Sequence, residues 1–77
     1  METSVTTVAA IGERAALQGF LLAGVRVLTA ENTGDVIDAW DALSPQTGIV
    51  ILTIKARAAL GTRTASLPAP LTVVLPS

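Results

Sequence analysis

The chain has 77 residues, of which 51% are hydrophobic and 14% are charged, and its formal net charge is −1. A chain of this length forms at most one domain, so we expect a single globular domain over residues 1–77. Its five Lys and Arg residues, with one Trp and one Phe, form no basic, aromatic surface for nucleic acid. The absence of Cys and His excludes a disulfide framework and removes the commonest metal ligand and general base.

The sequence also predicts a protein that does not insert into a membrane. No apolar run exceeds four residues, the length of 20–23 and 49–52, whereas a helix that spans a bilayer needs about 20. Residues 1–8 carry no positive charge, so we expect no secretory signal. The high apolar content has two interpretations, a well-filled core or surplus apolar surface for a partner.

Strand-like and helix-like patterns alternate along the chain. Residues 6–11, two threonines followed by Val, Ala, Ala and Ile, are typical of a short buried strand, and Gly12 breaks it. Apolar residues at helical spacing then predict a helix over 13–23, with the charge of Glu13 in its first turn. Gly24 stands where a helix ends in the left-handed conformation that favours glycine.

A second strand and helix follow. Residues 25–30 are apolar and β-branched, which predicts a strand, and Asn32 or Thr33 can cap the next helix. That helix is predicted to end near Leu43 and to be followed by a loop over 44–48. Its apolar side chains fall on one face, namely Val36, Ile37, Trp40 and Leu43.

The last third of the chain completes an α/β pattern. Residues 49–54 are apolar without alternation, which is typical of a parallel strand covered on both faces. A short helix over 55–60 ended by Gly61, a loop over 62–70 and a strand over 71–75 follow. Strands that alternate with helices predict parallel pairing. We therefore expect a small open parallel sheet of four strands, flavodoxin-like or Rossmann-like, in the order 2-1-3-4.

The strand ends carry no recognisable catalytic or cofactor motif. Gly12 is followed by no further glycine until Gly19, so neither a dinucleotide fingerprint nor a P-loop is present. A phosphoacceptor receiver module would need an aspartate after the third strand, where the chain has Thr53, Ile54 and Lys55. With no His to activate a hydroxyl, we expect no enzyme activity, no cofactor, no metal and no small-molecule substrate.

Several side chains are candidates for partner contact. Trp40 is either a core anchor or an interface residue, since Trp is enriched at both. We expect Lys55 and Arg57, with Arg63 nearby in sequence, to form a basic group on the surface. This group is either simply exposed to solvent or contacts acidic residues of a partner.

An acidic stripe lies on the second predicted helix. Asp35, Asp38 and Asp41 recur every third residue. They form a solvated face, a docking stripe for a basic partner or a divalent-ion site. The solvated face is the favoured interpretation, because the third carboxylate has rotated away from the first.

The stretch GFLLAG, residues 19–24, places a glycine at each end of four apolar residues. We expect Gly19 to let another backbone approach the first helix and Gly24 to end that helix. We also expect Phe20 to point toward the sheet. These residues, with Leu22 and Ala23, form the motif that carries a family resemblance.

The chain resembles the F subunit of the vacuolar-type and archaeal-type (V-type) rotary ATPases. That family opens with an apolar strand and an Ile-Gly-Asp turn, as in residues 8–13, and continues with T-G-F-x-L-A-G, as in residues 18–24, where Gln18 replaces Thr. Residues 48–53 are similar to its I-x-I-I-L-I-T strand, and residues 70–77 are similar to its P-x-x-x-E-I-P-S ending. The similarity covers residues 6–77.

This resemblance implies a role without catalysis. The F subunit binds the coiled-coil D subunit in the central stalk, and the pair turns inside the catalytic hexamer of A and B subunits. Rotation couples ATP hydrolysis or synthesis to transport of hydrogen or sodium ions. The resemblance thus implies a cytoplasmic rotor component, peripheral to the membrane, with protein partners. The alternative is a small flavodoxin-like regulatory or anion-binding module.

The chain also departs from the family pattern. Family members usually continue past the Pro-Ser ending with a C-terminal segment that reaches along the coiled coil, so we expect that this sequence is truncated or lacks that tail. Leu75 stands where the family often has Glu, and the loop 61–70 is less acidic than in the family.

Overall fold

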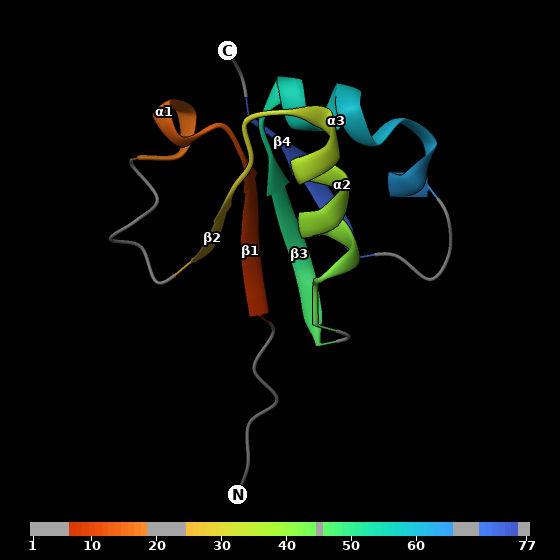
Figure 1. Cartoon of the computed structure of the whole chain (residues 1–77). Helices are drawn as coiled ribbons and strands as arrows, with labels where there is room; N and C mark the ends of the chain where they lie inside the picture. The colour runs from red at the N-terminus through yellow and green to blue at the C-terminus, as the bar shows by residue number, and fades with distance from the viewer. Residues whose placement is uncertain (1–6, 19–24, 45, 66–69, 76–77) are drawn as a thin grey trace, which may run out of the picture.

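The computed structural model describes residues 7–18, 25–44, 46–65 and 70–75 (Figure 1). Its strands form one parallel sheet in the order β2-β1-β3-β4, which confirms the predicted α/β fold and strand order. The elements in chain order are β1 (Thr7–Gly12), α1 (Arg14–Leu17), β2 (Arg26–Thr29), α2 (Thr33–Asp41), β3 (Thr47–Leu52), α3 (Ile54–Leu60), the 3₁₀ helix η2 (Gly61–Ala65) and β4 (Leu71–Val74).

The central strands β1 and β3 hold the sheet together. Ala9 pairs with Val50 and Ile11 pairs with Leu52, so these four side chains share one face of the sheet. All four are fully buried. Burial of this kind explains why the two segments read as nearly continuous apolar runs.

Helices α2 and α3 cover that face. Val36 from α2 and Ala56 and Leu60 from α3 join Ile11, Val50 and Leu52 in one core cluster. Trp40 is partly buried and packs against this cluster, which supports the core-anchor interpretation for most of its surface. Figure 1 shows α2 crossing in front of the sheet.

Helix α1 lies on the opposite face, over β1 and β2. Leu28 of β2 packs against the core cluster, and its neighbour Val27 instead lines a hollow together with Leu17 of α1. Leu17 is only 1% exposed. Right-handed crossovers demand this arrangement, because the chain moves in one direction from β1 to β2 and in the other from β2 to β3 and β4.

Several predicted boundaries were wrong. Helix α3 begins at Ile54, which the apolar pattern had assigned to the third strand, because Thr53 caps the helix at that point. The predicted loop 62–70 contains most of η2. Helix α2 ends at Asp41, two residues before Leu43. The described part of the first helix is Arg14–Leu17, and its predicted end at Gly24 lies outside the described residues.

Candidate functional site

The carboxyl ends of β1 and β3 meet at one edge of the sheet, where α/β proteins usually bind ligands. Gly12 ends β1 directly beside Thr53, which follows β3. A Cβ atom on Gly12 would overlap the Thr53 side chain. This close approach explains why the position needs glycine, since only a residue without a side chain leaves room for the threonine.

Glu13 and Thr53 are joined by a hydrogen bond across this edge. The Thr53 Oγ1 hydroxyl donates to Glu13 Oε1 at 2.6 Å, although the residues are 40 positions apart. The same hydroxyl oxygen accepts from the Ala56 amide at 3.1 Å and so caps α3. The Thr53 hydrogen bond, with a backbone hydrogen bond and the more distant Lys55 ammonium, lowers the pKa of Glu13 below its ordinary value of 4.5. We call Gly12, Glu13 and Thr53 the edge junction.

The segment after β2 makes a second set of contacts at the same edge. Glu31 Oε2 accepts a hydrogen bond from the Arg14 amide at 2.9 Å. Asn32 caps α2, because its Oδ1 accepts from the Asp35 amide at 2.8 Å and its Nδ2 donates to Asp35 Oδ2 at 3.1 Å. These polar groups therefore hold the starts of α1 and α2 in place.

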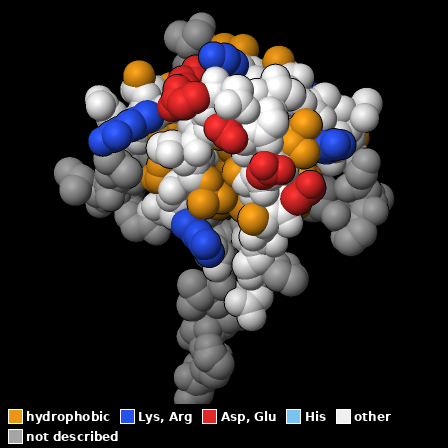
Figure 2. Space-filling model, in the orientation of Figure 1, with side chains coloured by type: hydrophobic (Ala, Val, Ile, Leu, Met, Phe, Trp, Pro, Cys, Tyr) orange, Lys and Arg blue, Asp and Glu red, His pale blue; other side chains and the backbone are white. Residues whose placement is uncertain are grey.

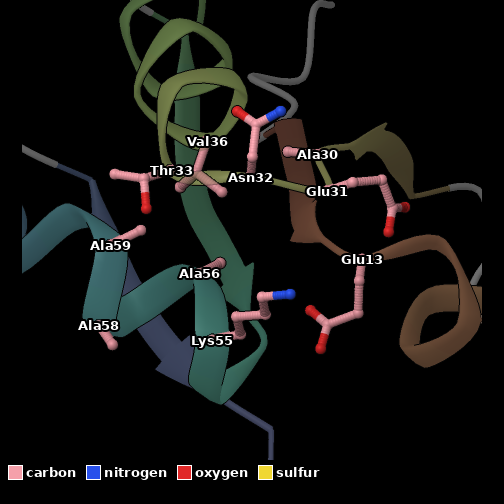
Figure 3. A pocket seen from close by; sticks show the side chains of 10 residues that line it. All are labelled: Glu13, Ala30, Glu31, Asn32, Thr33, Val36, Lys55, Ala56, Ala58 and Ala59. Atoms are coloured by element: carbon pink, nitrogen blue, oxygen red, sulfur yellow. The ribbon is translucent and has the colours of Figure 1, made fainter.

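A hollow of about 270 Å³ opens between these segments (Figure 3). Its polar rim carries two carboxylates, Glu13 and Glu31, and one ammonium, Lys55, which points toward Glu13 in Figure 3. The rim is thus net negative and does not suit an anion. Besides these three, the lining residues are Ala30, Asn32, Thr33, Val36, Ala56, Ala58 and Ala59.

The structure does not bring the candidate contact residues Trp40, Lys55 and Arg57 together on one surface. Trp40 faces the core cluster from α2, while Lys55 lines the hollow. Arg57 is exposed and donates from Nη1 to the Gly61 carbonyl at 3.3 Å. Residues two positions apart on a helix face different sides, and Lys55 and Arg57 of α3 are both exposed, as is Arg63 of η2. Their contact with acidic residues of a partner stays a prediction. The motif residues Gly19, Phe20, Leu22, Ala23 and Gly24 lie outside the described residues.

The acidic side chains are exposed along α2 and the segment before it. Figure 2 shows a band of acidic side chains across this side of the molecule, and Glu31, Asp35, Asp38 and Asp41 are all exposed. Within the described ranges, no three such side chains gather where they could hold a metal ion. The stripe is thus consistent with a solvated helix face.

The sequence patterns did not indicate the edge junction as a unit. Thr53 carried a recognisable signal, since threonine is a strong N-cap residue and an Ala-rich helix follows it. The approach of Glu13 to Thr53 depends on the pairing of β1 with β3, which no local pattern reports.

No family model matches the chain, and no curated protein matches it. In the part of the chain that the structure describes, no helix has the length and apolar character that a membrane span requires.

Proposed function

We propose that the chain is a non-catalytic rotor component in the central stalk of a vacuolar-type or archaeal-type rotary ATPase, equivalent to the F subunit. In this role it binds the coiled-coil D subunit and turns with it inside the catalytic hexamer of A and B subunits. It thereby helps to couple ATP hydrolysis or synthesis to transport of hydrogen or sodium ions. Its place is the cytoplasmic side of the membrane, as a peripheral part of the complex.

The observation that carries this proposal is the edge junction. The family resemblance depends on an Ile-Gly-acid turn early in the chain and on an apolar strand that ends in Thr. In the structure, the acid and the threonine of these two elements, Glu13 and Thr53, share a hydrogen bond of 2.6 Å. Gly12, the middle residue of the turn, leaves the space for Thr53. The turn and the strand therefore have a physical reason to occur together in one sequence. This favours a fold shared with the F subunit family over a chance similarity of the two motifs.

The chemistry of the carboxyl edge supports a role without catalysis. Thr53 and Asn32 cap helices, and the carboxylates of Glu13 and Glu31 accept hydrogen bonds from Thr53 and from the Arg14 amide. Nucleophilic catalysis needs a hydroxyl or thiol next to a base that can activate it. The Thr53 hydroxyl does bind a carboxylate, but Thr53 is 3% exposed and its hydroxyl is occupied by the α3 cap.

The alternative, a small anion-binding regulatory module, has less support. Such a module would show a concave site at the strand ends with cationic side chains or free amide groups. The hollow there carries two carboxylates against one ammonium. The amide of Asp35 in the first turn of α2 is already bound by Asn32.

Binding of the chain to the coiled-coil rotor protein of the same organism tests the proposal. We expect the purified chain to form a one-to-one complex with that protein, measured by size-exclusion chromatography with light scattering. The chain alone should neither hydrolyse ATP nor bind it in calorimetry. Absence of a complex, both for this chain and for a version extended beyond Ser77, would overturn the proposal.

A further inference from the structure

We draw no further inference here: the strongest candidate, the hollow of about 270 Å³ at the carboxyl edge between the starts of α2 and α3, belongs to the site already described, and its two carboxylates, Glu13 and Glu31, already accept hydrogen bonds from Thr53 and from the Arg14 amide, so nothing among the described residues points to a ligand that fills it.

Discussion

Strands β3 and β4 are made of the same kinds of residue but differ in their cover. On the central strand β3, Val50 and Leu52 are fully buried under α2 and α3. On β4, Leu71 and Val73 on one face are 65% and 47% exposed and Val74 on the other face is 41% exposed, because β4 lies at the edge of the sheet. Both sets are β-branched or aliphatic, so hydrophobicity alone does not decide which side chains form the core. The difference comes from topology.

The strand order explains why the described helices cover the two faces of the sheet unequally. With the order β2-β1-β3-β4 and right-handed crossovers, α2 and α3 fall on one side and α1 falls alone on the other. The described part of α1, Arg14–Leu17, is one turn long. A second helix on that side would need a further crossover, and the described chain supplies none. Among the described residues, one face of the sheet therefore carries two helices and the other carries one.

The largest expected effect separates the central strand from the edge strand directly. Leu52→Ala removes a fully buried side chain and should lower the free energy of unfolding by about 2–5 kcal/mol. A domain of 77 residues has only about 4–12 kcal/mol in total, so this loss is severe. Val73→Ala should cost less than about 1 kcal/mol, because about half of the Val73 surface is already exposed to water. Urea unfolding measures both, and equal losses would show that Val73 on β4 is covered in solution.

The architecture could be predicted from the sequence because it depends on order and period. Four apolar strand patterns separated by helical spacing define a parallel sheet, whatever the details of each end. The boundaries were harder. Ile54 is apolar and follows an apolar strand, yet it is 51% exposed at the start of α3. The apolar pattern did not show that β3 ends at Leu52 and that the Thr53 side chain caps α3 directly after it.

The candidate site was less predictable than the fold, because it depends on contacts between distant segments. Lys55 was singled out by its charge, but its position over the hollow beside Glu13 follows from the pairing of β1 with β3. The different burial of Ile51 and Leu52 has the same origin. Ile51 and Leu52 are both large aliphatic residues of the same strand. Only the strand register and the positions of the helices show that Leu52 faces α2 and α3 and that Ile51 faces the other side of the sheet.

The next effect concerns the edge junction, where the segment toward α1 meets the start of α3. Gly12→Ala should destabilise the chain by about 1–3 kcal/mol, the usual cost of overpacking, since the new Cβ overlaps Thr53. Gly34 provides the matched control. A Cβ there meets only Asn32 Oδ1, at 3.4 Å, on an exposed helix. Gly34→Ala should be neutral or stabilise by up to about 1 kcal/mol.

Thermal and urea unfolding of the two alanine variants test whether the close approach of Gly12 to Thr53 requires glycine. A Gly12→Ala variant as stable as the unmodified chain would mean that β1 and α3 can separate at no cost. The starts of α1 and α3 would then be held together only by the pairing of the strands. In that case the edge junction would not explain why the turn after β1 carries glycine.

The smallest effect tests whether charge contributes to this junction. Because the hydrogen bond from Thr53 lowers the pKa of Glu13 below 4.5, the folded state favours the ionised carboxylate. Its contribution is present above pH 4.5 and is lost as the pH falls through the lower pKa of the folded state. Glu13→Gln keeps an acceptor oxygen and removes the charge, so it should cost less than about 1 kcal/mol at neutral pH. The difference from the unmodified chain should shrink as the pH falls below 4.5.

The same comparison in a Thr53→Val background isolates the contact. Without the hydroxyl, Glu13→Gln should lose most of its pH-dependent effect, and urea unfolding of the four variants between about pH 3 and 7 measures the coupling. The loss in free energy of unfolding caused by Glu13→Gln could also be constant over this pH range in both backgrounds. That result would mean that the charge of the carboxylate does not stabilise the contact between Glu13 and Thr53. The fit of Gly12 against Thr53 would then be the whole physical basis of the junction.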